Sequence, residues 1–131
     1  MNTLFRIEDM LKALSDAVSS TGLKVFPTTR PDSVPGKMME FAVVSVPTTI
    51  HNMTYGLDYG WNLGTCSVEI FVRDKGGLEN VSRLSKLVND VASLFPVSFN
   101  DILASRPSLV MSGSDGYGFH VATLNATIQT I

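Results

Sequence analysis

Hydrophobic and polar positions alternate between Glu40 and Arg73, a pattern typical of two β-strands joined by a turn. Pro47 lies where the parity of the pattern changes, and because proline cannot donate to a ladder, we expect a bulge, a bend or an edge position there. Near the base of this hairpin the aliphatic residues are at even positions: Ala42, Val44, Val46, Cys66, Val68, Ile70 and Val72. Near the tip the large side chains are at odd positions: His51, Met53, Tyr55, Leu57, Tyr59, Trp61 and Leu63.

A turn at Gly56-Leu57-Asp58 fixes one antiparallel register for the whole hairpin. In this register the predicted partners are Tyr55 with Tyr59, Met53 with Trp61, Val46 with Val68, and Val44 with Ile70.

The predicted hairpin is long for a domain of this size. Strands of about fifteen residues extend roughly 50 Å, whereas a compact domain of 131 residues is roughly 36 Å across. We therefore expect residues 47–65 to form a projecting arm. Its apolar tip needs a cover, because soluble monomers seldom expose such a patch. A neighbouring subunit is the favoured cover, and an arm folded back as a lid over its own sheet is the alternative.

The remaining pattern predicts two amphipathic helices and several shorter strands. Apolar residues recur at helical spacing over Thr3–Ser20, where Gly22 can end the helix, and again over Leu78–Phe95, which Pro96 stops. Strand patterns cover Leu23–Phe26, Pro107–Ser112 and Gly118–Ile131, whereas Val97–Ser105 is ambiguous and Pro27–Lys37 is a loop.

These elements predict a single domain over residues 1–131, of the α/β class in its α+β form. We expect a mostly antiparallel or mixed sheet of about five strands, two helices packed on one face, and the projecting hairpin. The opposite sheet face carries Phe41, Val43, Phe71 and Phe119, and is predicted to be a second contact surface. The last strand carries a row of small polar residues suited to a shared or solvated surface: Thr123, Asn125, Thr127 and Gln129.

Charge and composition narrow the classes of partner. Charged residues make up 17% of the chain, the net charge is −2, and the lysines and arginines are scattered, so no basic patch for nucleic acid is expected. No apolar run is long enough to span a membrane, and no signal peptide is recognised, so we expect an intracellular protein without a membrane partner. Cys66 is alone and is predicted to be a small core residue.

No motif in the sequence predicts catalysis or a cofactor. Lys75-Gly76-Gly77 lacks the spacing of a phosphate loop, and Gly113-Ser114-Asp115-Gly116 with His120 is explained by a hairpin turn. No metal-ligand spacing surrounds His51 or His120, and an interface role is favoured for His51. We predict a non-enzyme without cofactor, catalytic or metal site.

The order of elements resembles the tail-terminator, or tail-completion, proteins of tailed bacteriophages. The resemblance covers nearly the whole chain and is one of order and length; its local echoes are Leu23–Pro27, Phe41–Val46, and the strand Ser67–Val72 followed by the helix from Leu78. Trp61 and the aromatic tip match no motif of that family.

The resemblance implies a structural virion protein, assembled in the cytoplasm of a bacterial host. Such a subunit forms a homo-oligomeric ring, typically a hexamer, that caps the tail tube, ends its polymerisation and offers a surface for head attachment. The implied partners are a second copy, the tail tube protein and a head-completion protein. The predicted subunit interface comprises His51, Met53, Tyr55, Leu57, Asp58, Tyr59, Trp61, Arg73 and Lys75.

Two alternatives remain open. The chain could be a head–tail connector or minor tail protein of similar design. It could also be a small-molecule binding domain or enzyme with a pocket under a folded-back hairpin, using His51, Tyr55 and Trp61.

Overall fold

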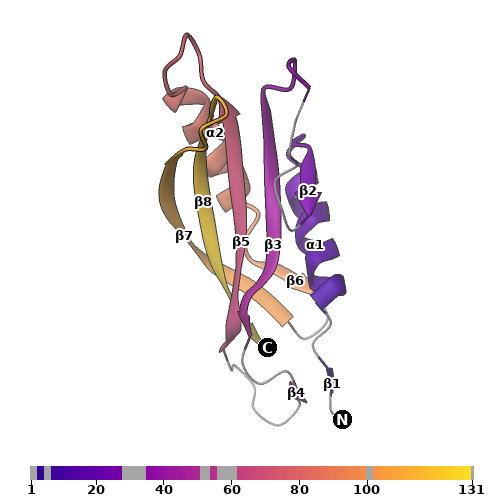
Figure 1. The fold of residues 1–131 in the computed structure, drawn as a ribbon. Coiled ribbons are helices and arrows are strands. Elements are labelled where there is room, and N and C mark those ends of the chain that lie inside the picture. The colour runs from indigo at the N-terminus through magenta and orange to yellow at the C-terminus, as the bar shows by residue number, and fades with distance from the viewer. Residues whose placement is uncertain are drawn as a thin grey trace.

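A curved sheet with two helices on one face makes up most of the structure, a computed structural model that describes residues 3–4, 7–27, 35–50, 54–55, 62–99 and 102–130 (Figure 1). Side chains are described within 8–27, 35–46, 64–98 and 103–129. The elements are β1 (Thr3–Leu4), α1 (Ile7–Ser19), β2 (Val25–Pro27), β3 (Glu40–Ile50), β4 (Thr54–Tyr55), β5 (Asn62–Arg73), α2 (Val81–Ala92), β6 (Val97–Phe99), β7 (Ile102–Ser114) and β8 (Phe119–Thr130).

The main sheet has six strands in the order β2-β3-β5-β8-β7-β6. Strands β2 and β3 are parallel, and the other neighbours are antiparallel. The α+β class and the mixed sheet are therefore confirmed. The strand beyond the expected five is β6, which comes from the ambiguous stretch 97–105 and pairs with the beginning of β7.

Both helices are shorter than the periodic pattern predicts. α1 begins at Ile7 because Thr3–Leu4 form β1, which pairs with β4, and it ends before Gly22, whose φ of 94° ordinary side chains rarely adopt. α2 begins at Val81 because Lys75 and Leu78 are bridged across a turn, and the Asn80 side chain then caps the helix.

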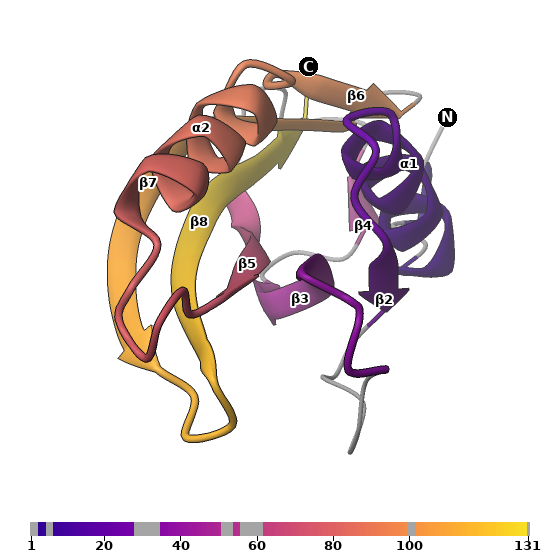
Figure 2. The same cartoon turned by 90° about the horizontal axis from the view of Figure 1, so that it is seen from above.

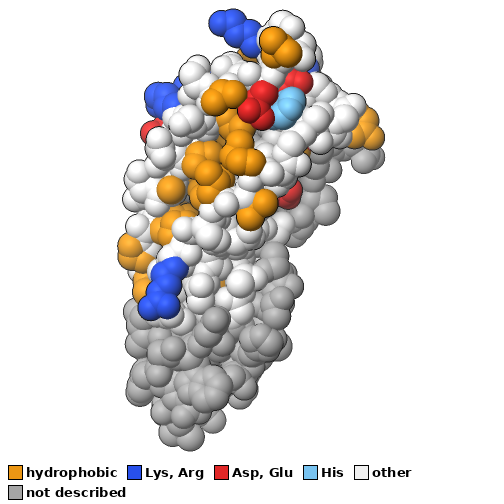
Figure 3. Space-filling view, turned by 90° about the vertical axis from the view of Figure 1, so that its left-hand side faces the viewer, with side chains coloured by type: hydrophobic (Ala, Val, Ile, Leu, Met, Phe, Trp, Pro, Cys, Tyr) orange, Lys and Arg blue, Asp and Glu red, His pale blue; other side chains and the backbone are white. Residues whose placement is uncertain are grey.

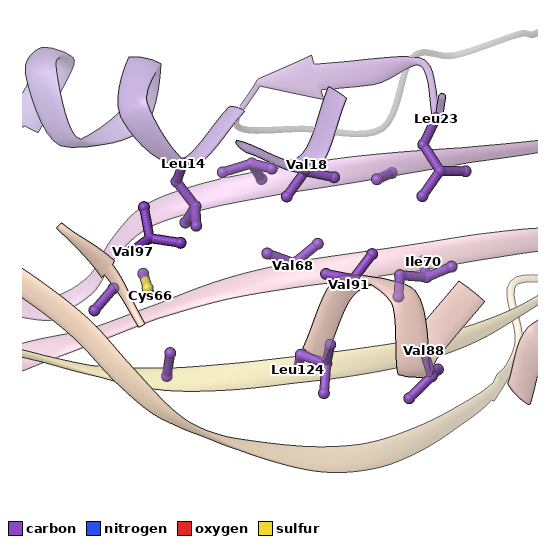
Figure 4. Close-up of a cluster of buried hydrophobic side chains, with 14 of the residues drawn as sticks. Leu14, Val18, Leu23, Cys66, Val68, Ile70, Val88, Val91, Val97 and Leu124 are labelled. Carbon is purple, nitrogen blue, oxygen red and sulfur yellow. The ribbon is translucent and has the colours of Figure 1, made fainter. Parts of the chain in front are cut away.

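The helices lie on the concave side of the sheet, where they bury the main core (Figure 2). Met10, Leu14 and Val18 project from α1 at helical spacing, and Leu84, Val88 and Val91 project from α2. They meet the even positions of the hairpin base predicted to be buried: Ala42, Val44, Val46, Cys66, Val68, Ile70 and Val72. Figure 4 shows Val68, Ile70 and Cys66 facing these helices. The base of the hairpin is thus part of the subunit's own core.

The convex face of the sheet carries a second buried cluster rather than an open contact surface. Phe41 and Phe71 stack with their ring centroids 4.5 Å apart, and Phe119 meets Phe41 edge-on at 5.2 Å. The partly buried side chains of Phe26 and Met38 pack against this cluster. The prediction of a contact surface at Phe41, Val43, Phe71 and Phe119 is therefore wrong, because all four are at most 4% exposed within the single chain.

The hairpin contains the expected irregularity at Pro47, but its base has a different register from the one predicted. Val44 lies opposite Val68 rather than Ile70, and the register shifts between Ser45 and Thr49. Beyond the shift, Thr49 pairs with Thr65 as predicted. Because the two registers differ by an even number of residues, every side chain keeps its predicted face.

Candidate interaction site

The arm begins where the β3–β5 ladder ends. Ile50 lies opposite Gly64 in the last described pair, so the segment 51–63 connects two neighbouring strand ends. Thr54–Tyr55 form β4 and pair with Thr3–Leu4 of β1 in the same chain, with Thr3 opposite Tyr55. Part of the arm therefore lies against the N-terminal strand.

Most of the predicted interface residues lie outside the described residues. These are His51, Met53, Leu57, Asp58, Tyr59 and Trp61. Tyr55 is placed only by the backbone of β4. The predicted pairings of Tyr55 with Tyr59 and of Met53 with Trp61 likewise involve residues outside the described part of the chain.

Arg73, at the end of β5, is engaged within its own chain. Its guanidinium carbon lies 4.5 Å from the centroid of the Phe119 ring, a cation–π contact. Its Nε donates to the carbonyl oxygen of Met38 at 3.1 Å, and its terminal nitrogen donates to that of Pro35 at 3.4 Å. The side chain thus fastens the segment before β3 over the convex cluster.

Lys75 lies beyond Arg73 in an exposed turn. The Lys75 N–H donates to the Leu78 carbonyl at 2.8 Å, and the Leu78 N–H donates back at 3.2 Å. Gly76 and Gly77 supply the positive φ angles, 61° and 78°, that this turn requires. Lys75-Gly76-Gly77 therefore belongs to a turn, and the exposed side chain of Lys75 is available to a partner.

The same end of the sheet holds a histidine between two carboxylates. His120 Nδ1 on β8 lies 2.6 Å from Asp74 Oδ1, and its Nε2 lies 3.8 Å from Glu79 Oε1. The hydrogen bond with Asp74, followed by the neighbouring negative charges, raises the pKa of His120 above its ordinary value of 6.5. Sequence spacing gave no signal for this cluster, because 46 residues separate His120 from Asp74.

The turn beside this cluster forms as predicted. The Asp115 carboxylate accepts from the Tyr117 N–H at 2.7 Å and from the Phe119 N–H at 3.2 Å, and Ser114 Oγ accepts from the Gly116 N–H at 3.1 Å. These bonds close the β7–β8 hairpin. Ser114 and Asp115 therefore serve the turn.

A groove of about 430 Å³ separates the beginning of α2 from β3 and β5. Arg83 from α2 reaches across it and binds both carboxylate oxygens of Glu40, with Nε 2.7 Å from Oε2. Arg73 and Arg83, the two arginines that line the groove, are thus both bound to groups of the chain itself and hold its walls together.

The exposed edge of β7 is a second feature that the sequence pattern did not reveal. Leu109, Val110 and Met111 are about half exposed there. The sequence feature that could have indicated this surface is the run of three consecutive apolar residues between two serines. Such a run places apolar side chains on both faces of a strand. Only the strand order shows that this segment lies at an edge.

Among the described residues, no group of three or more His, Cys, Asp or Glu side chains is arranged to hold a metal ion. No helix in the same part of the chain is long and apolar enough to cross a bilayer.

In sequence comparisons, the chain matches no protein-family model and no curated protein.

Proposed function

We propose that this chain is a structural subunit that assembles head to tail into a ring, and that the ring caps the tail tube of a tailed phage as a terminator. The proposal rests on the family resemblance in the order of elements and on the different chemistry of the two ends of the sheet. The described fold agrees with the α+β subunit that the resemblance implies.

The observation that carries the proposal is the chemical difference between the two ends of the sheet. One end of the β3–β5 ladder leads into the arm, whose sequence is apolar at alternate positions. The other end, roughly 40 Å away along β5, carries the charged or polar residues Arg73, Asp74, Lys75, Glu79 and His120. A ring with two different faces needs such a heterologous contact between unlike surfaces.

The arm supplies one side of the proposed contact. Met53, Tyr55, Tyr59 and Trp61 pack on the neighbouring subunit, and His51 and Leu57 extend this apolar surface. Asp58, the one acidic residue between positions 51 and 63, pairs with a cation of the neighbour, for which the exposed Lys75 and the more enclosed Arg73 are the candidates. Aromatic side chains are favourable anchors, because each buries a large area at low cost in conformational entropy.

Particle mass and electron microscopy with tail tubes test the proposal. We expect closed rings, either free in solution or formed on added tubes, and we expect tube lengths to stop increasing when the protein is added. Trp61→Ala should abolish both effects, whereas Tyr117→Ala should not, since Tyr117 is an aromatic residue 71% exposed on a different turn. A protein that neither forms rings nor binds tube ends refutes the terminator role, and binding only to heads favours a connector.

A further inference from the structure

Strand β7 leaves an open sheet edge between Ser108 and Ser112. β6 pairs with β7 only along Ile102–Ala104. Register irregularities fall between Ser105 and Ser108 and between Met111 and Gly113, and the segment between them pairs with β8 on one side. No other described strand covers its outer side. The N–H and C=O groups of such an edge can bind a further strand.

The open segment is apolar on both of its faces. Leu109 and Met111 face the helices and are 48% and 54% exposed, while Val110 faces the convex side and is 50% exposed. Proteins usually protect an edge strand with charged residues, yet the nearest charged residues along the chain are Arg106 in β7 and Asp115 in the turn after it. Figure 3 shows hydrophobic side chains gathered in a band on this side of the molecule.

The apolar character continues from β7 onto α2. Leu109 and Met111 line a groove of about 260 Å³ together with residues of the helix. The α2 residues on this side recur at a spacing of four and carry no charge: Val81, Ser85 and Asn89. The charged residues of α2 pair elsewhere, Arg83 with Glu40 and Lys86 with Asp90. Both layers of the edge thus have the depletion of charge that marks the centre of a protein interface.

We infer that the occupant of this edge is a second copy of the chain, bound through antiparallel pairing of the two β7 strands about a twofold axis at Val110. The segment from Ser108 to Ser112 reads Ser-Leu-Val-Met-Ser, which is self-complementary in polarity when reversed. Antiparallel pairing then matches every position with one of its own kind: Ser108 with Ser112, Leu109 with Met111, and Val110 with Val110 of the second copy.

The faces and charges agree with this arrangement. Leu109 and Met111 lie on the same face of β7, so each pair that they form across the axis stays beside the α2 layer. Arg106 precedes the segment and Asp115 follows it, so antiparallel pairing brings opposite charges toward each other at both ends. The result is one continuous sheet with a helix α2 from each copy on the same face.

This twofold contact is separate from the proposed ring and does not depend on it. A contact between identical surfaces closes after two copies, whereas a ring with unlike faces grows through unlike surfaces. The β7 pairing therefore describes a dimer of free subunits.

Charge substitutions at the axis provide the main test, with sedimentation equilibrium as the measurement. All proteins in this test carry Trp61→Ala, which removes the proposed ring contact, and this parent protein should show a concentration-dependent monomer–dimer equilibrium. Val110→Lys and Val110→Glu should each weaken it about tenfold or more, because each places like charges opposite each other. An equimolar mixture of the two variants should form a heterodimer at least as readily as the parent protein forms its homodimer. Leu78→Lys is the matched control, since Leu78 is 73% exposed in the turn that precedes α2 and is not part of the β7 edge.

Disulfide trapping provides an independent test of the register. Val110→Cys should cross-link to itself under mild oxidation, because directly opposite Cβ atoms on antiparallel strands lie about 5 Å apart. Leu78→Cys should not cross-link under the same conditions.

Three results would overturn the inference. They are a Trp61→Ala parent protein that stays monomeric, a dimer that survives Val110→Lys, and a mixture of the two charge variants that fails to associate. None of them bears on the ring, which Trp61→Ala tests, and that substitution should leave the β7 dimer unchanged.

Discussion

The imidazole of His120 and the carboxylate of Asp74 join the last strand to the turn that follows β5, with Nδ1 and Oδ1 2.6 Å apart. Both side chains are largely enclosed, 23% and 16% exposed. Glu79 lies on the other side of the ring, and Asp115 adds a further negative charge. The protonated imidazole is therefore favoured in the folded chain, and the pKa of His120 is raised by its bond with Asp74.

This relationship predicts that stability falls as the solution becomes more alkaline. The pKa of His120 is higher in the folded than in the unfolded chain, so its stabilising effect is fully present below about pH 6.5 and is lost as the pH rises through the folded-state value. Urea unfolding between about pH 5.5 and pH 8.5 should show this decline in the wild type and a smaller one in His120→Gln. Equal declines in both proteins, or an NMR titration of His120 with a midpoint at or below 6.5, would contradict the prediction.

The ion pair between Arg83 and Glu40 is expected to stabilise the packing of α2 against β3. The pair is bidentate, so it should stabilise the fold more than an ordinary surface ion pair does. The side chains of Arg83 and Glu40 are 40% and 23% exposed, however, so solvent screening reduces this stabilisation. We expect Glu40→Gln to lower the free energy of unfolding by about 1 kcal/mol. Asp90→Asn, which removes the exposed pair with Lys86, should lower it by only about 0.3 kcal/mol. A double-mutant cycle at positions 40 and 83 measures the coupling, and zero coupling would rule out this role.

The helices and the hairpin base could be predicted because burial imposes a period on the sequence. Val44 and Val68 are both fully buried, as their even positions in an alternating pattern indicate. Their register could not be read from the same pattern, because a shift by two residues leaves every side chain on its face. Pro47 cannot donate a hydrogen bond to the ladder, and the register shifts around it. The alternation of apolar and polar residues does not predict the size of such a shift.

The convex cluster and the charged end needed the tertiary structure. Phe41 looked exposed because its covering residues, Phe26 and Met38, belong to a short strand and a loop that have no clear period. His120 meets Asp74 only because β8 lies beside β5 in the sheet, with His120 opposite Val72. Contacts between distant segments depend on the order of the strands in the sheet, and local sequence patterns do not predict that order.

The convex cluster should contribute strongly to the stability of the single chain. Phe41 is fully buried, stacks on Phe71 and meets Phe119 edge-on. We expect Phe41→Ala to lower the free energy of unfolding by about 3–5 kcal/mol and Phe41→Leu to lower it by about 1–2 kcal/mol. Tyr117→Ala is the control and should change stability by less than about 0.5 kcal/mol, because Tyr117 is exposed. A small effect of Phe41→Ala in chemical denaturation would show that this face is not part of the core.

Cys66 should be inert in the folded protein. The thiol is fully buried on the helix-facing side of β5, and burial raises its pKa to about 12. At pH 8 the thiolate fraction is then on the order of 10⁻⁴, and the reagent has no access to the sulfur. Labelling by a thiol reagent should therefore follow unfolding of the chain and accelerate in parallel with it as urea is added. Tyr117→Cys supplies the control within one molecule, because its exposed position should be labelled at once while Cys66 stays protected. Rapid modification of both thiols without urea would refute the buried environment of Cys66 and, with it, the packing of the helices on the hairpin base.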